Sequence, residues 1–224
     1  MTKYVEFSYP IDPSRSVLEG GFRPPSVEVR SRISEGRHSN TSYISMFAHT
    51  GTHMDAPWHF IDDGYKIEDF PIDSFVFSRV LFVEIQAESW QPVPVEAVRP
   101  CETELKEADC LLIYTGFSRY RAQDKEEYIE ATPGLSVELA EYLSQFPRLV
   151  CVGVDFISIE NVANGRKTGF PVHHALLGGE VQRILLEDAN LSCLRGRSIA
   201  KVYLFPLRVV GLEASPVTAV AELA

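Results

Sequence analysis

Five of the six histidines in this sequence fall in two short segments, and the first segment combines them with an acidic residue. This segment holds His49, His53, Asp55 and His59. All four positions are odd, so an extended backbone would direct their side chains to one face. Imidazole and carboxylate groups together suit Zn²⁺ or Mn²⁺, and one carboxylate can bridge two ions. The segment therefore predicts a site for one or two divalent metal ions.

The spacing of these histidines requires a bend in the chain. In a straight strand the Cα atoms of His49 and His53 would lie roughly 13 Å apart, too far for shared ligation at metal-to-nitrogen distances of about 2 Å. Gly51 permits such a bend because it lacks a Cβ. Gly51 and Pro57 also oppose a continuous helix, which excludes a helical HExxH site. A single HxxxH pattern is more often a hydrogen-bonded loop, but three histidines, an aspartate and a glycine favour the metal site.

The second histidine segment covers residues 171–187 and combines His173 with Glu187. On one continuous helix these two residues would lie about 21 Å apart. We expect the glycine pair at 178–179 to end a short helix, and a strand from Val181 to bring Glu187 back towards His173. The alternative places His173 on a helix surface and Glu187 at a solvated strand end, and the spacing is equally compatible with it.

The remaining patterns predict an α/β fold with a mixed sheet, in a single domain of residues 1–224. The clearest helix is expected over 132–146, with Thr132 as its N-cap, and a shorter helix over 102–109. A strand followed by a turn of helix is expected over 207–220. Other strands are expected at Tyr43–Ala48, Arg79–Ile85, Cys110–Tyr114, Leu149–Val154 and Ile199–Phe205.

Composition limits the classes of function. The net charge is −10, and no stripe of lysine and arginine offsets it, so we expect no nucleic acid partner. The chain lacks a signal peptide pattern and a run of about 18 apolar residues, so we expect no membrane span and a cytoplasmic location. The four cysteines have no CxxC spacing and are expected in the core. Walker and GxGxxG motifs are absent, which argues against a dinucleotide cofactor.

With these residues in hand, the chain resembles the metal-dependent hydrolases of the cyclase family, which includes bacterial kynurenine formamidases and isatin hydrolases. The strongest part of the resemblance is HTGTHMDAPWHF at His49–Phe60, which matches the family pattern HxGTHxDxPxHF at every fixed position. The resemblance implies the swivelling β/β/α fold of this family, which is usually assembled as a homodimer or larger homo-oligomer.

The resemblance also implies roles for individual residues. It implies that His49, His53 and Asp55 bind one metal ion, with Asp55, His173 and Glu187 binding a second where there are two. His59 would be the catalytic acid/base. Two features depart from the family pattern: an early Trp-Pro-Gly-Asp segment is absent, and two extra residues separate His173 from Glu187. The substrate therefore stays open, with arylformamidase activity as one candidate.

The expected activity is hydrolysis of an amide, lactam or ester bond in a small molecule by metal-activated water. His59 is suited to carry the proton, since an unperturbed imidazole has a pKa of about 6.5. Trp58, Phe60 and Phe170 would either form an apolar wall for an aromatic substrate or belong to the core. Two alternatives are a non-catalytic metal-binding module, in which protein fills every ligand position, and a metal-dependent lyase or dehydratase on the same scaffold.

Overall fold

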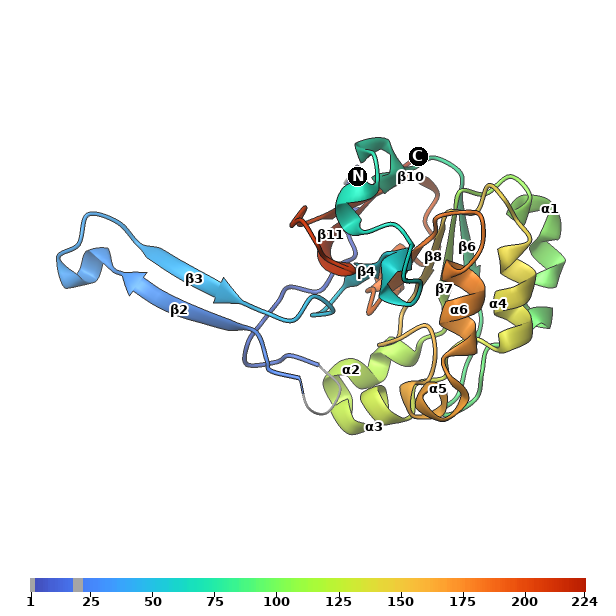
Figure 1. Cartoon of the computed structure of the whole chain (residues 1–224), viewed down its shortest axis with the longest axis horizontal. Coiled ribbons are helices and arrows are strands. Elements are labelled where there is room, and N and C mark those ends of the chain that lie inside the picture. The colour runs from blue at the N-terminus through green and yellow to red at the C-terminus, as the bar shows by residue number, and fades with distance from the viewer. Residues whose placement is uncertain (1–2, 18–21) are drawn as a thin grey trace.

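The computed structural model describes residues 3–17 and 22–224 of the chain (Figure 1). In these residues, nine strands form one mixed sheet: β1 (Tyr4–Glu6), β4 (His53–Asp55), β5 (Val76–Phe77), β6 (Val80–Glu84), β7 (Cys110–Tyr114), β8 (Cys151–Val154), β9 (Ile184–Glu187), β10 (Ile199–Pro206) and β11 (Ala214–Leu223). The strand order is β5-β10-β11-β4-β9-β8-β7-β6, and β1 pairs with β11.

The sheet combines a parallel part with an antiparallel part. Strands β6 to β9 are parallel, whereas β4 runs antiparallel to both of its neighbours, β9 and β11. Strand β6, at one end of the path, also approaches β10 near the other end, so the sheet is nearly closed. The expected α/β fold with a mixed sheet is therefore confirmed, and β4 lies at the junction between the two parts.

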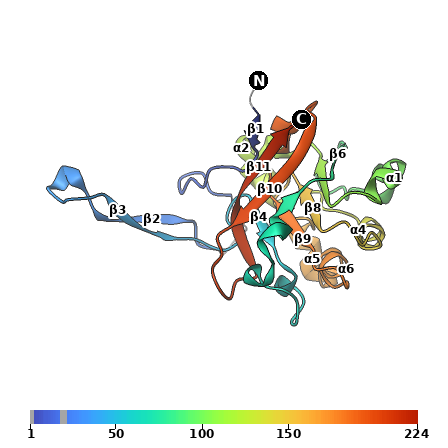
Figure 2. The same ribbon diagram turned by 90° about the horizontal axis from the view of Figure 1, so that it is seen from above.

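Hydrophobic side chains fill the space on both faces of this sheet. The helices are α1 (Glu102–Leu105), α2 (Tyr120–Gln123), α3 (Lys125–Glu130), α4 (Val137–Ser144), α5 (Val162–Thr168) and α6 (Pro171–Leu177). Helices α4 and α6 lie side by side on one face (Figure 2). Along β7, Leu111 and Ile113 join the core under these helices, while Cys110 and Leu112 join the second core on the opposite face. This period-two alternation explains why every position from 110 to 113 is apolar.

Two helices begin or end at residues other than those expected. The helix predicted over 132–146 begins only after Ser136, whose hydroxyl accepts a hydrogen bond from the Leu139 N–H. Gly134 has φ +71° and passes so close to the backbone at Asn161 that a Cβ would collide, so Thr132 lies in an irregular segment before the helix and not at its N-cap. The short helix expected over 102–109 covers only its first four residues.

Several strand boundaries also differ from those expected. The prediction of a strand followed by a turn of helix over 207–220 was wrong, because residues 207–213 connect two strands and β11 follows. Pro216 lies where β11 changes its pairing from β4 to β10, a position where a missing N–H is tolerated. The strand expected from Val181 begins at Ile184, and the strand expected at Tyr43–Ala48 covers Thr41–Ser45.

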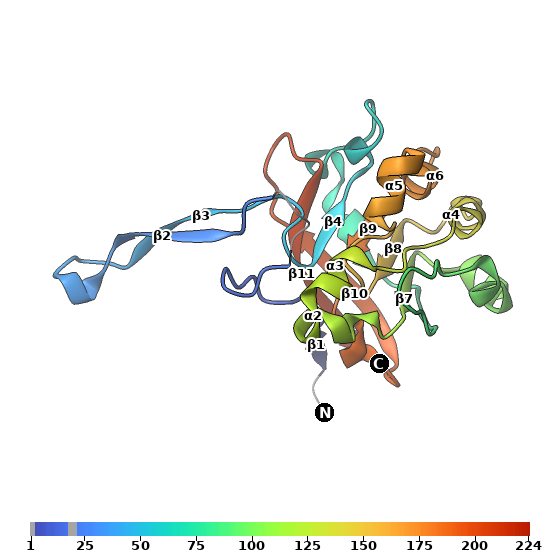
Figure 3. The ribbon, with the colours of Figure 1, turned by 90° about the horizontal axis from the view of Figure 1, so that it is seen from below.

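A two-stranded ribbon extends far from the sheet. It consists of β2 (Ser26–Ser31) and β3 (Thr41–Ser45), and it leaves the rest of the chain on the side opposite α1 and α4 (Figures 1 and 3). Across residues 3–17 and 22–224, no helix is long and apolar enough to cross a bilayer. All four cysteines are free, and Cys110 and Cys151 are buried.

Candidate metal centre

Strand β4 brings the acidic and imidazole groups of two segments together. His53 and Asp55 are the first and last residues of β4, so their side chains share a face while Met54 points into the opposite core. Glu187, the last residue of β9, pairs directly with His53 across the antiparallel ladder. The two segments expected to form the site are therefore adjacent strands, which places Glu187 beside His53 in spite of the long sequence separation.

The bend expected at Gly51 is present. Gly51 has φ +66°, a left-handed conformation that side chains with a Cβ rarely adopt. Its carbonyl oxygen lies 2.8 Å from Nδ1 of His53, which fixes the ring so that Nε2 faces the acidic groups. The bend also brings His49 back, with its Nδ1 2.9 Å from Oδ1 of Asp55. Gly51 therefore contributes to the site through its backbone.

The donor atoms converge within a small volume. Nε2 of His53 lies 3.4 Å from Oδ1 of Asp55 and 3.3 Å from Oε2 of Glu187. All three residues are buried or nearly so, and the contacts of Nε2 of His53 and Oδ1 of Asp55 are with other members of this cluster. Oδ2 of Asp55 is buried and has no hydrogen-bond partner within the described residues. A buried carboxylate oxygen without a partner is costly, and a divalent cation held between these groups would satisfy it. The donor set therefore fits the divalent metal expected from the sequence.

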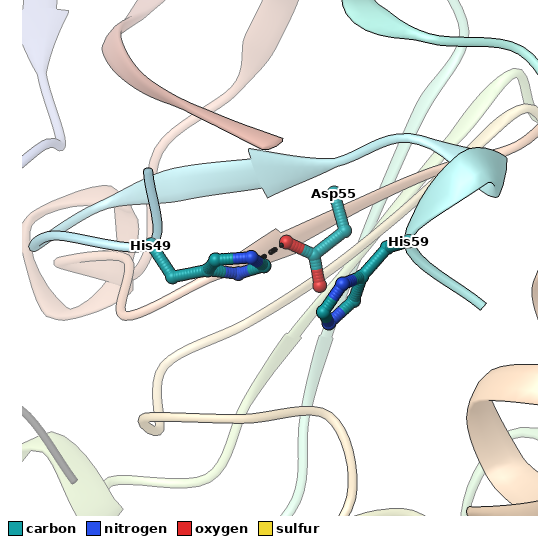
Figure 4. A group of neighbouring side chains, drawn as sticks. All are labelled: His49, Asp55 and His59. Atoms are coloured by element: carbon teal, nitrogen blue, oxygen red, sulfur yellow. Dashed lines mark ion pairs between the residues drawn. The ribbon is translucent and has the colours of Figure 1, made fainter. Parts of the chain in front are cut away.

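His59 lies in the same cluster of donor atoms. It ends a short 3-10 helix, Pro57–His59, and its ring centre is 4.4 Å from that of His49. Figure 4 shows both imidazoles on either side of the Asp55 carboxylate. One ligand atom from each of these three residues lies within 4.8 Å of the others, so His59 is close enough to act as a ligand. Its role as an acid/base separate from the ligands stays a prediction.

His173 reaches the centre from the first turn of α6. Its Nε2 lies 3.7 Å from Oε1 of Glu187, while its Nδ1 lies 2.9 Å from Oε2 of Glu160. A carboxylate on one ring nitrogen orients the other towards a metal ion, and it raises the basicity of the ligand. The ring of His173 also stacks on Phe60 at 4.4 Å between ring centres. The structure therefore brings His173 together with Glu187, as the predicted helix-to-strand reversal requires.

Sequence reasoning assigned no role to two acidic residues that contact the histidines. Glu160 is buried and holds His173, and Glu213 lies 3.4 Å from Nε2 of His49. Glu160 precedes His173 by 13 residues and belongs to a different element, whereas Glu213 lies far along the chain from His49, and neither belongs to a spacing pattern with a histidine. A search for carboxylates able to orient each histidine would need the tertiary structure, since nothing in the local sequence marks these two residues.

The pKa values of these groups reflect a balance between burial and the charges of their neighbours. Burial favours the neutral imidazole of His49, but attraction to the Asp55 carboxylate is the stronger effect and raises the pKa of His49 to about 10. Burial likewise opposes ionisation of Asp55, yet His49 lowers the pKa of that carboxyl group below its ordinary value. For His59 burial prevails and lowers the imidazole pKa. The carboxylates thus stay ionised in an interior that requires positive charge nearby.

A cavity of about 340 Å³ opens onto these groups. Its walls combine the imidazoles and Glu187 with apolar side chains that include Phe22, Phe47, Phe60 and Phe170. Trp58 does not line the cavity, and its ring instead packs under Lys66. Of the three aromatic residues expected to contact a substrate, Phe60 and Phe170 therefore lie at the cavity, and it is large enough for a small aromatic molecule.

A second ionic cluster lies directly behind the centre. Asp188 follows Glu187 and has φ +50°, an uncommon conformation for a residue other than glycine. Arg121 forms a bidentate pair with its carboxylate at 2.7 and 2.8 Å, and the Tyr128 hydroxyl donates to it at 2.6 Å. The Asp188 carbonyl accepts a hydrogen bond from Thr52, next to His53. This cluster therefore anchors the ends of both strands that carry metal-ligand candidates.

Comparison with known proteins agrees with this geometry. The chain is 27% identical to a kynurenine formamidase of Bacillus cereus over 98% of this chain and 97% of that protein. It is 32% identical to an uncharacterized protein of Haemophilus influenzae over 52% of this chain and 83% of that protein. Isatin hydrolase A from Labrenzia aggregata, bound to benzyl benzoate, superposes with a TM-score of 0.82 at 22% identity, over 97% of this chain and 92% of that chain.

The structural likeness shows a common fold, and the family itself is shown by sequence. A family model named Cyclase matches residues 5–161, which run from β1 through the segments that supply His53, Asp55 and Glu160. This match covers well over half of the chain and includes the histidine motif from which the resemblance was inferred. The chain belongs to the Cyclase family.

Proposed function

We propose that this chain is a metal-dependent hydrolase that cleaves an amide, lactam or ester bond in a small aromatic substrate. The observation that carries the proposal is the convergence of buried imidazole and carboxylate groups beside a cavity with aromatic walls. The names of the relatives support the same reaction class, since kynurenine formamidases and isatin hydrolases cleave carbon–nitrogen bonds other than peptide bonds. The substrate of this chain is expected to share that chemistry.

The proposed metal ligands are His49, His53, Asp55, His173 and Glu187. A mixed set of imidazole and carboxylate groups suits Zn²⁺ or Mn²⁺, and we propose one of these as the resident ion. When bound, such an ion supplies Lewis-acid chemistry, which lowers the pKa of water and polarises a carbonyl group. Asp55 is the residue that both proposed ligand groups share, because its carboxylate faces His49 on one side and His53 on the other.

His59 is the proposed proton carrier. Burial lowers the pKa of its imidazole, so the neutral ring that accepts a proton dominates at neutral pH. The ring lies at the cavity wall and packs edge-on against Phe60 at 4.4 Å between ring centres. The ring centres of Phe60 and Phe170 are 5.2 Å apart. These two rings would hold an aromatic substrate beside the His59 imidazole and exclude water from the substrate's other side.

The cavity also bears on the non-catalytic alternative. A structural metal site has every ligand position filled by protein and needs no space beside it. Here the imidazoles and Glu187 line a cavity that a small molecule can enter. This arrangement favours the enzyme over the metal-binding module.

One experiment tests the cofactor and the reaction together. The purified protein is analysed for bound metals, stripped with a chelator, and reloaded with Zn²⁺ or Mn²⁺. Each form is then incubated with N-formyl aryl amines, isatin-like lactams and aryl lactones, and the products are identified by mass spectrometry. Addition of one water to a substrate only in the reloaded protein is the expected result. Absence of bound metal and of hydrolysis would overturn the proposal, and loss of water from a substrate would identify a dehydratase.

A further inference from the structure

The chain leaves the metal centre at Glu160 and returns to it at His173. Glu160 lies 2.9 Å from Nδ1 of His173 and also accepts a hydrogen bond from the His173 backbone N–H at 3.2 Å. The residues between these two therefore form a loop whose ends are held together. This loop contains α5, which lies beside α6 (Figure 1). We call residues 161–170 the α5 loop, and its attachment beside His173 places it next to the proposed metal ligands.

One side of the α5 loop faces the cavity. Val162 and Arg166 both line the cavity, and they lie one helical turn apart in α5, so their side chains project from the same side of the helix. Phe170, which follows the end of α5, also lines the cavity. The loop thus supplies an aliphatic group, a guanidinium and an aromatic ring to one wall.

The ring of Phe170 is held in place by Gly165. Phe170 has φ +55°, an uncommon conformation for a residue other than glycine, and its N–H donates a hydrogen bond to the Gly165 carbonyl oxygen at 3.0 Å. The ring lies so close to Gly165 that a Cβ there would collide with it. The same ring centre is 5.8 Å from that of His173. Phe170 therefore connects the wall next to the metal ligands with the wall next to Arg166, the neighbour of Gly165.

Arg166 brings a permanent positive charge to this wall. Among the described residues that line the cavity, its guanidinium is the group that stays protonated at every physiological pH. The acidic lining residues have other partners, since Glu187 is a proposed metal ligand and Asp188 pairs with Arg121. A guanidinium has several N–H donors, so Arg166 is able to bind an anion in addition to partners within the protein. Its planar fork matches a carboxylate in particular.

We propose that Arg166 is a specificity-determining residue that binds a carboxylate on the aromatic part of the substrate, while the aromatic ring packs against Phe170. This inference rests on the proposed hydrolase function, which places the bond to be cleaved at the metal ligands. The substrate class is an aryl amide, lactam or ester with an anionic group remote from that bond. A neutral analogue lacks the contact with the guanidinium and therefore binds more weakly.

The first test compares substrates that differ by one carboxylate. N-formylaniline and the meta and para (formylamino)benzoates carry the same amide, and the ratio of their kcat/KM values is compared between variants, so that differences in intrinsic reactivity cancel. Arg166→Met is expected to lower the preference for the better benzoate by about fivefold or more, through a higher KM. Arg166→Lys keeps the charge without the planar fork and should retain part of the preference. Lys167→Met is the matched control, because Lys167 is exposed and does not line the cavity.

The second test needs no turnover, which separates this inference from the proposed reaction. Acetophenone and the meta and para acetylbenzoates carry a ketone in place of the amide, so hydrolysis cannot cleave them. Calorimetric titration of the protein as purified is expected to show about fivefold or more tighter binding of the better acetylbenzoate, a difference that Arg166→Met removes and Lys167→Met keeps. A carboxylate that binds a metal ion instead would keep its advantage in Arg166→Met, and that result would overturn the proposal. An Arg166-dependent difference without hydrolysis of any amide would support the carboxylate site and contradict the hydrolase function alone.

The third test separates recognition of the ring from recognition of the charge. Phe170→Leu is expected to raise the KM of both kinds of substrate by a similar factor, about threefold to tenfold, and to leave their ratio unchanged. Gly165→Ala should have the same effect, because its Cβ would displace the Phe170 ring. Circular dichroism and metal analysis of each variant separate these effects from unfolding and from loss of the centre.

Two kinetic results would overturn the assignment of Arg166: an unchanged ratio in Arg166→Met, or an equal fall of the ratio in Lys167→Met. An unchanged KM in Phe170→Leu would refute the role of the aromatic ring.

Discussion

Glu187 and Asp188 are neighbours in the chain, and both carboxylates are buried, yet their negative charges are balanced in different ways. Asp188 has its counter-charge within the chain, because Arg121 pairs with it through two hydrogen bonds and Tyr128 donates a third. Glu187 also accepts hydrogen bonds, from the Ile159 N–H and the Ser158 hydroxyl, but its ionic neighbours are His53 and His173, which carry a positive charge only when protonated.

The difference separates a structural carboxylate from a functional one. A buried carboxylate with a guanidinium partner and a hydroxyl donor is satisfied by protein alone. At the centre, the cationic neighbours of Glu187 and Asp55 are imidazoles, and Oδ2 of Asp55 has no hydrogen-bond partner among the residues described. Asp188 thus has a permanent counter-charge and Glu187 does not, and substitutions on each side should have different consequences.

The largest effect is expected at Asp55, which both proposed ligand groups share. Asp55→Asn keeps the shape of the side chain but removes its charge, so we expect loss of bound metal and at least about a thousandfold loss of turnover, or about 4 kcal/mol. Metal analysis and kinetics on the substrate found in the screen measure both effects. Asp63→Asn, at an exposed position, is the control and should retain both properties. Full metal content in Asp55→Asn would contradict the assignment.

A smaller loss of turnover is expected on substitution of His59. This substitution tests whether His59 is a metal ligand or a proton carrier. His59→Ala is expected to retain metal and to lose about a hundredfold to a thousandfold in kcat, which lies in the lower part of the usual range for general acid–base catalysis. The comparison is with His53→Ala, which should lose metal as well. Because His59 lies close enough to His49 and Asp55 to share an ion that they would hold, loss of metal in His59→Ala would identify it as a ligand.

For the Asp188 cluster, Arg121→Met should lower the free energy of unfolding without a direct effect on the proposed metal ligands. The substitution leaves Asp188 buried without its guanidinium, which costs about 3 kcal/mol in the free energy of unfolding. Denaturant unfolding of the metal-free protein measures this loss in the free energy of unfolding. Adding Asp188→Asn removes the uncompensated charge and should recover part of the loss. Arg119→Met, at a more exposed arginine, is the control, and an equal loss there would contradict the argument.

The smallest effect is expected at the carboxylates that orient the histidines. Glu160→Gln keeps the shape of the side chain but weakens the contact with Nδ1 of His173, so we expect metal affinity to fall about tenfold to a hundredfold. Glu213→Gln should cost less, because Glu213 is partly exposed and lies farther from its histidine. Competition with a chromogenic chelator measures both affinities. An equal affinity in Glu160→Gln and the wild type would show that His173 needs no such partner.

Much of the site could be predicted from local sequence. The residues His49, His53 and Asp55 lie within one short segment, and the shared face of His53 and Asp55 and the need for a bend at Gly51 follow from strand geometry and ligand distances. The common strand face predicted for His49 and His59 was wrong, because His49 precedes the bend and His59 ends a 3-10 helix. The strands Cys110–Tyr114 and Ile199–Pro206 were equally visible, because burial on one or both faces leaves a regular apolar pattern.

Other features depended on contacts between distant segments. The sequence could not choose between a ligand and a surface role for Glu187, because its position depends on the pairing of β9 with β4. Glu160 and Arg121 were overlooked for the same reason, since each acts on a residue that only the tertiary structure brings near.

The helix start at Ser136 was decided by the close approach of Gly134 to Asn161, which outweighs the local preference of Thr132 and Pro133. Sequence alone thus determined which groups could bind a metal ion, and the tertiary structure decided which buried carboxylates face an arginine and which face imidazoles, because charge balance depends on neighbours in space.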